Sequence, residues 1–231
     1  MHFSLTAALL CLSLTLGAAP AVAAPKTTAA GIPLDAQWKI TIYDLAKTKF
    51  IHPAWGWQHS ERNYLIGMKL AKGDHLTVDA DVLFAAAFLH DMAAFAPYEK
   101  KGVEHGDRAA QTSVAVLRSA GFPMSKLAAV QAAERGHMYY SKPGSSPEAI
   151  VLHDADSLDF LGTIGAARMI ALTGEKAASF RSAVTTLRSF LHDIPRSLIT
   201  RTGRTMGAAR AAELERLLDQ LNVETFGGKV I

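Results

Sequence analysis

Eight consecutive apolar residues, Val82 to Leu89, lead directly into the dipeptide His90-Asp91. The run is far shorter than the roughly 20 residues that a membrane-spanning helix needs. A helix that is apolar on all sides is buried among other helices of a soluble core. We therefore expect this segment to form the central helix of a domain, with two ionisable side chains at its C-terminal end.

The remainder of the chain also has helical periodicity. Alternating, strand-like runs are missing from the sequence, and Gly or Pro residues interrupt the apolar pattern at intervals typical of helix lengths. We predict helices at about 35–50, 57–72, 79–91, 104–120, 123–136, 148–160, 163–172, 175–192 and 205–222. The predicted fold class is all-α, with a single domain over residues 34–231 whose C-terminal helices pack on its core.

The composition excludes several classes of protein. Lys and Arg number 24 against 21 Asp and Glu, so the net charge of +3 does not indicate a dedicated nucleic-acid binder. Cys11 is the single cysteine, and it lies inside the first apolar stretch of the chain. A chain trimmed after that stretch has no thiol, which excludes disulfides, cysteine-ligated zinc and thiol catalysis.

The N-terminus has the pattern of an export signal. A short apolar stretch, Leu5 to Leu16, precedes the small-x-small triplet Ala21-Val22-Ala23. We predict a cleaved signal peptide at residues 1–23, a flexible leader at 24–33, and a mature chain that is periplasmic or secreted. A buried N-terminal helix is the alternative. No later segment has the length and apolarity of a membrane span.

Histidine and aspartate side chains stand out at several points of the predicted helices. They are His59, the pair His90-Asp91, His105, His137 and Asp156, the last within an acidic segment. Burial of such groups without partners costs several kcal/mol, so they either hydrogen-bond to one another or share a cation. Nitrogen and oxygen ligands without sulfur suit Mn, Fe, Co, Ni or Zn, and Mg is also an option.

This order of residues resembles the HD-domain superfamily of metal-dependent phosphohydrolases, in which a His, a His-Asp pair and a distal Asp follow one another. The resemblance covers residues 52–172, the expected HD core. Its motifs are Ala87-Phe88-Leu89-His90-Asp91-Met92, Glu104-His105, and the segment DADSLDFLG at 154–162. It implies that one divalent cation is held by His59, His90, Asp91 and Asp156.

Roles for three further residues follow, two from the resemblance and one from helix spacing. His105 and His137 fit the two-metal variant of the superfamily, in which Asp91 would bridge the ions; with a single ion they would instead donate to a phosphate. Arg62 lies three residues after His59, so it shares a helix face with it. Arg62 could clamp a phosphate beside the catalytic Asp91, with a structural or surface ion pair as the alternative.

The function implied by the resemblance is hydrolysis of phosphate esters or anhydrides in a small phosphorylated compound, with a nucleotide as one option. The N-terminal export pattern predicts that this activity lies outside the cytoplasm. Two alternatives remain open from the sequence. The first is a di-iron oxygenase on the same scaffold. The second is a non-catalytic helical binding protein, in which the His and Asp side chains only satisfy one another. No stable nucleic-acid partner is expected, and the oligomeric state is left open.

Overall fold

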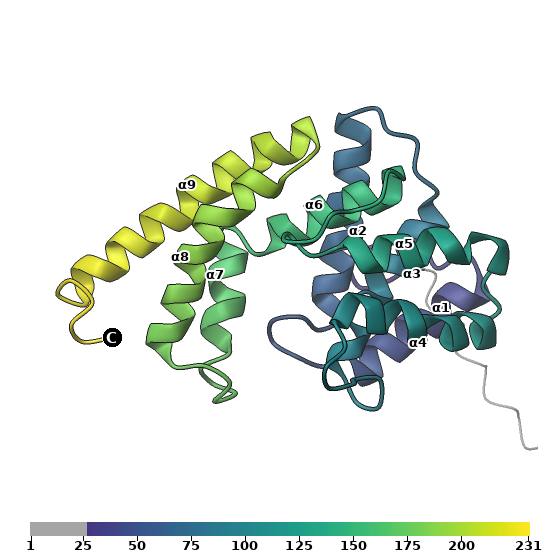
Figure 1. Ribbon diagram of the computed structural model, residues 1–231, viewed down its shortest axis with the longest axis horizontal. Helices are drawn as coiled ribbons and strands as arrows, with labels where there is room; N and C mark the ends of the chain where they lie inside the picture. The colour runs from purple at the N-terminus through teal and green to yellow at the C-terminus, as the bar shows by residue number, and fades with distance from the viewer. Residues whose placement is uncertain (1–26) are drawn as a thin grey trace, which may run out of the picture.

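A computed structural model describes residues 27–231, and over these residues the chain is helical, without a β-sheet (Figure 1). The α-helices are α1 (Gln37–Lys49), α2 (Trp57–Gly73), α3 (Ala80–Leu89), α4 (His105–Ala120), α5 (Leu127–Gly136), α6 (Pro147–Asp159), α7 (Gly162–Ala171), α8 (Phe180–Ser197) and α9 (Arg201–Glu224). Two short 3-10 helices, Met92–Ala94 and Met124–Lys126, precede α4 and α5. Helices α1–α6 form one group, and α7–α9 extend from it as a second (Figure 1). The all-α prediction is confirmed.

Helix α3 lies at the centre of the first group, as its apolar run predicts. Every side chain from Val82 to Leu89 is buried, and the rings of Phe84 and Phe88 stack with centroids 4.5 Å apart. Asp79 caps the helix, because its Oδ1 accepts hydrogen bonds from the backbone N–H groups of Asp81 and Val82. The helix ends at Leu89, so the next two residues, His90 and Asp91, lie inside the domain.

Helices α2 and α6 pack along each other beside α3 (Figure 1). Helix α6 is buried along almost its whole length, including the polar side chains of Asp154, Asp156 and Asp159. Ser146 caps it through a hydrogen bond from the backbone N–H of Ala149. Three buried carboxylates close together on one helix need partners from the helices around it.

The C-terminal helices have an apolar cluster of their own, which includes Met169 of α7, Leu187 of α8 and Leu214 of α9. Asp154 ties the turn between α8 and α9 to the first group of helices. Its carboxylate accepts hydrogen bonds from the backbone N–H of Ile199 and from both the N–H and the hydroxyl of Thr200. Thr200 also caps α9.

Four predicted helix boundaries are wrong. Helix α8 begins at Phe180, not 175, because Lys176 has φ of +56° and Ser179 provides the cap. The same helix ends at Ser197, not 192. Helix α9 begins at Arg201, not 205, directly after the Thr200 cap. The segment predicted as one helix at 123–136 is divided, with a 3-10 turn before α5.

The predicted flexible leader at 24–33 is wrong for residues 27–33. Thr28 and Ile32 are buried, and the backbone N–H groups of Ala29 and Ala30 donate to the Tyr43 hydroxyl and the Glu61 carboxylate. Ile32 joins the main apolar cluster, which offsets the entropy of ordering the segment. The predicted signal peptide and residues 24–26 lie outside the described residues. Within residues 27–231, none of the helices has the length and apolarity to cross a membrane.

Gly121 follows the last residue of α4 and allows the cost of a left-handed backbone conformation to be tested. It has φ of +84°, and a Cβ added there would meet no atom within 4 Å. We expect Gly121→Ala to lower the free energy of unfolding by about 1 kcal/mol, from backbone strain alone. Gly144 is the control, because its surroundings are equally open and its φ is not positive. Denaturant titration of Gly144→Ala should show no loss; equal losses in both variants would contradict this expectation.

Candidate metal centre

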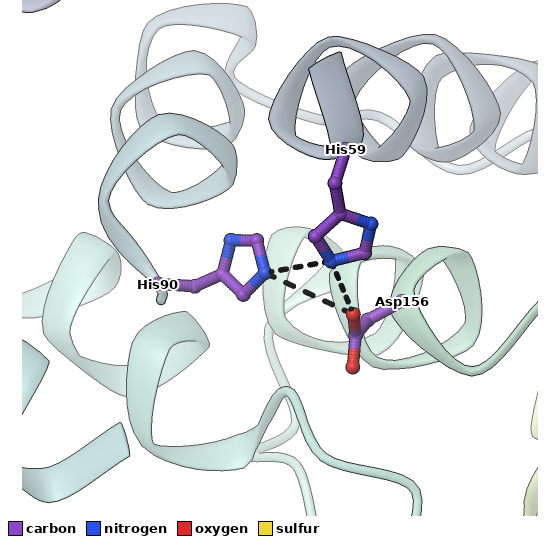
Figure 2. Close-up of side chains that lie close together, drawn as sticks. All are labelled: His59, His90 and Asp156. Carbon is purple, nitrogen blue, oxygen red and sulfur yellow. Dashed lines mark hydrogen bonds and ion pairs between the residues drawn. The ribbon is translucent and has the colours of Figure 1, made fainter. Parts of the chain in front are cut away.

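Five helices bring the predicted ligands together. His59 lies in the first turn of α2, His90 and Asp91 follow α3, His105 opens α4, His137 follows α5, and Asp156 lies on α6. Figure 2 shows His59, His90 and Asp156 pointing toward one another from separate segments of the chain. Residues almost 100 positions apart thus meet at one point in the fold.

The inner group of four side chains is compact. The Nε2 atom of His59 lies 3.0 Å from Asp156 Oδ1 and 3.3 Å from the Nε2 atom of His90. Asp91 Oδ2 lies 3.3 Å from His90 Nε2 and 3.6 Å from His59 Nε2. His59, His90 and Asp156 are almost completely buried. The donor atoms of these three lie within 4.8 Å of one another, a spacing at which one ion could bind all of them.

Asp91 faces a second pair of imidazoles with its other oxygen. Asp91 Oδ1 lies 3.7 Å from the Nε2 atoms of both His105 and His137. These two Nε2 atoms are 3.0 Å apart. The carboxylate of Asp91 therefore lies between two His pairs, with one oxygen directed toward each pair.

The hydrogen bonds of the four imidazoles fix which nitrogen faces the centre. Each Nδ1 atom meets an oxygen: Asp159 Oδ2 for His59 at 2.7 Å, Ala87 O for His90 at 2.9 Å, Glu104 Oε1 for His105 at 2.8 Å, and Glu134 O for His137 at 2.6 Å. A carbonyl or carboxylate oxygen only accepts, so we assign the proton to Nδ1 in each ring. In the neutral rings all four Nε2 lone pairs then point inward, the arrangement typical of metal-binding histidines.

The carboxylates of the cluster stabilise a positive charge at its centre. Burial alone would lower the pKa of His90, but the nearby carboxylates of Asp91 and Asp156 outweigh it and raise this pKa to about 9. Burial and the charge of His90 lower the pKa of His137 to about 4. Although burial opposes ionisation of Asp91, the charge on His90 holds the pKa of that carboxyl well below its usual range. Without a metal, the centre therefore keeps a proton on His90.

Two buried oxygen atoms without hydrogen-bond partners in residues 27–231 indicate that the centre binds a ligand. Asp156 Oδ2 and Asn63 Oδ1 have no hydrogen-bond partner among the residues that the structure describes. A buried carboxylate oxygen without a partner is costly, and a cation would relieve both this cost and the repulsion among the Nε2 lone pairs. The donor set thus fits a divalent cation that accepts imidazole nitrogen and carboxylate oxygen.

Asn63 is part of this cluster, although the sequence analysis missed it. It lies one helical turn after His59 and is fully buried. Its Nδ2 atom is 3.2 Å from His59 Nε2 and 3.3 Å from Asp156 Oδ1. The four-residue spacing from His59 on one helix face was the available signal.

Asp159 holds the ring of His59 in place and also pairs with two arginines. Arg62 donates to it through Nε and Nη2, both at 2.8 Å, and Arg168 donates through Nη1 at 3.0 Å. Arg62 is therefore in a structural ion pair, the alternative that the sequence left open. A phosphate contact by Arg62 remains a prediction.

Metal binding should release a proton at neutral pH. With a pKa of about 9, His90 is protonated at pH 7 in the metal-free protein, and its Nε2 must lose a proton to bind a metal. We expect calorimetry in buffers of different ionisation enthalpy to show release of about one proton per ion at pH 7. The apparent affinity should rise with pH and level off above about pH 9, where His90 becomes mostly neutral. Proton release near zero at pH 7 would contradict this expectation.

Comparison with known proteins identifies an HD domain within the chain. Residues 56–161 match the family model of the HD domain. A solved Lactobacillus plantarum protein is 20% identical, with a TM-score of 0.65 over 84% of this chain and 98% of that one. A structure described as a predicted HD superfamily hydrolase, from an uncultured Thermotogales bacterium, is 24% identical, with a TM-score of 0.56 over 81% of this chain and 90% of that one.

A third similar structure is Bacillus subtilis YpgQ in complex with ADP, which is 19% identical, with a TM-score of 0.61 over 80% of this chain and 97% of that one. No curated protein matches the chain. At these identities the solved structures show the fold alone. The match at residues 56–161 confirms the resemblance seen in the motifs, and this part of the chain is an HD domain.

Proposed function

We propose that this HD-domain protein is a metal-dependent phosphohydrolase, which cleaves an ester or anhydride bond in a small phosphorylated compound. One observation supports this above the others. The two oxygens of Asp91 face two pairs of imidazole Nε2 atoms, at distances of 3.3–3.7 Å. With divalent cations bound, such a centre would carry enough positive charge to bind a phosphate group despite the carboxylates around it.

The residues divide into two groups in this proposal. His59, His90, Asp91 and Asp156 hold one ion tightly, because three of the four are fully buried and all are hydrogen-bonded or ion-paired. His105 and His137, with Asp91, form an adaptable second position. The side chain of His105 is 31% exposed, so this position is open to solvent and to a substrate.

In the reaction, a water oxygen forms a bond to phosphorus while the bond from phosphorus to the leaving oxygen breaks. A bound divalent cation polarises the phosphate and lowers the pKa of water. Asp91, at the open side of the centre, orients the attacking water. The water loses a proton to the solvent and the leaving oxygen gains one from it, so the products are inorganic phosphate and an alcohol or a shorter phosphate.

We also propose that the protein acts outside the cytoplasm. The support is the N-terminal pattern of residues 1–23, with its short apolar stretch and small-residue triplet. Amino-terminal sequencing of the protein from its native host tests this: a chain that begins at Ala24 is the expected result, and an intact Met1 would contradict it.

A metal-dependent release assay tests the activity itself. The purified chain is stripped with a chelator, reloaded separately with Mn, Co, Ni or Mg, and assayed for phosphate release from nucleotides, sugar phosphates and aryl phosphates. We expect release with at least one metal and none in the stripped protein. Iron-dependent oxygen consumption without phosphate release would favour the oxygenase alternative. A stripped protein as stable as the loaded one, again without phosphate release, would favour the binding protein.

A further inference from the structure

We propose that the substrate is a phosphate monoester with an apolar, aromatic-sized leaving group, and that this group occupies a cavity beside Asp91 and His105. The inference rests on the proposed function for the phosphate end of the substrate. The cavity has a volume of about 370 Å³, within the range of small-molecule pockets. It lies between the HD domain and helices α7 and α8.

The cavity meets the metal centre on its accessible side. Asp91 and His105 both line it, and their facing atoms are 3.7 Å apart, so they occupy one side of the cavity. Their side chains are 17% and 31% exposed, whereas His59 and His90 are almost completely buried. A phosphate bound at the centre from this side would project its ester group into the cavity.

The other walls of the cavity are apolar. They are formed by Trp55, Met138, Phe160, Met169, Leu172 and Phe190. The aromatic side chains among them are held by neighbouring rings: Trp55 stacks on His52 with centroids 3.8 Å apart, and Phe160 packs on Phe190 at 4.9 Å. Aromatic and methionine side chains together favour a flat apolar group.

The lining also disfavours polyphosphates and nucleobases. Neither lysine nor arginine contributes to the wall of this cavity among the described residues, so further phosphates would have no cationic partner. Thr186 is the remaining polar residue of the wall. The polar edge of a base would therefore lose its water without sufficient hydrogen bonds in return.

A second depression near the metal centre is less suited to admit a substrate than the apolar cavity is. It is lined by His52, Gln58 and Arg62, among others, and has a volume of about 290 Å³. His59 is the predicted metal ligand that lines it, and His59 is 1% exposed. The guanidinium of Arg62 is already paired with Asp159. The apolar cavity is therefore the route by which a substrate reaches Asp91.

Phosphonates test the cavity without turnover, because hydrolysis does not cleave their P–C bond. The full chain loaded with Mn is titrated by calorimetry with 2-naphthylmethylphosphonate, methylphosphonate, AMP and ATP. We expect the naphthyl compound to bind at least tenfold more tightly than methylphosphonate and than either nucleotide. Equal affinity for the two phosphonates, or tighter binding of AMP or ATP, would overturn the proposal. Failure of the hydrolysis assay would instead reject the proposed function alone.

Two cavity variants complete the test. Leu172→Ala should weaken binding of the naphthyl compound about fivefold relative to methylphosphonate, while Leu65→Ala, at an exposed position of α2, should leave that ratio unchanged. Thr186→Lys adds a cation to the wall and should shift preference from the naphthyl compound toward ATP by at least fivefold. If neither cavity variant changes these ratios, the ligands bind elsewhere and the proposal is wrong.

Discussion

Asp91→Ala should abolish both metal binding and phosphate release. Among residues 27–231, Asp91 is the side chain with an oxygen directed at each His pair, so its loss removes a ligand from both positions. It also removes the carboxylate that we propose to orient the water. We expect kcat/KM to fall by about 10³-fold or more, corresponding to roughly 4 kcal/mol of lost transition-state stabilisation. Metal content after desalting should fall from at least one ion per chain to near zero.

Asp44→Ala is the control for this experiment. Asp44 is an exposed carboxylate of α1, and the substitution removes the same charge away from the centre. Metal content and kcat/KM should stay at the wild-type values in this variant. If Asp91→Ala kept full activity, the site assignment would be wrong, whatever the fold.

Asp159→Asn should lower the free energy of unfolding more than any other substitution proposed for this protein. The carboxylate of Asp159 is fully buried and is paired with His59, Arg62 and Arg168. Arg168 is only 2% exposed, so the substitution leaves a buried guanidinium without its charge partner. Breaking one side of a buried ion pair costs about 3–5 kcal/mol. We expect a loss of this size in the free energy of unfolding, measured by denaturant titration of the metal-free proteins.

The same substitution should also weaken metal binding. The charged acceptor of the His59 Nδ1–H is lost, and loss of such a partner lowers metal affinity about 10–100-fold. Asp107→Asn is the matched control, because Asp107 and Arg135 form an exposed ion pair at 3.6 Å. Breaking that pair should cost less than about 1 kcal/mol and leave metal affinity unchanged. Equal effects of the two substitutions would show that Asp159 does not support the centre.

The central helix and the meeting of the His and Asp side chains could be predicted from the sequence. The run from Val82 to Leu89 can be buried only at the middle of a helical domain, and its end fixes where His90 and Asp91 lie. The family motifs then indicate which distant His and Asp residues meet that point. Both signals are carried by short segments of sequence.

Other features depend on contacts between distant parts of the chain. The ion pair of Arg62 with Asp159 spans 97 positions, so the sequence left its role open between phosphate and protein. The capping Thr200 is fixed by Asp154, 46 positions earlier, which explains the error at the start of α9. Residues 27–33 have no periodicity of their own, and their contacts with distant side chains, such as Tyr43 and Glu61, determine where they pack.

Anomalous diffraction from a crystal grown with Mn is the most direct test of the shared cation. We expect an anomalous peak about 2.0–2.3 Å from the Nε2 atoms of His59 and His90 and from carboxylate oxygens of Asp91 and Asp156. A weaker second peak beside Asp91, His105 and His137 would fit the adaptable position. If these side chains enclose no metal in the presence of excess Mn, or if the metal binds elsewhere on the chain, the account of this centre is contradicted.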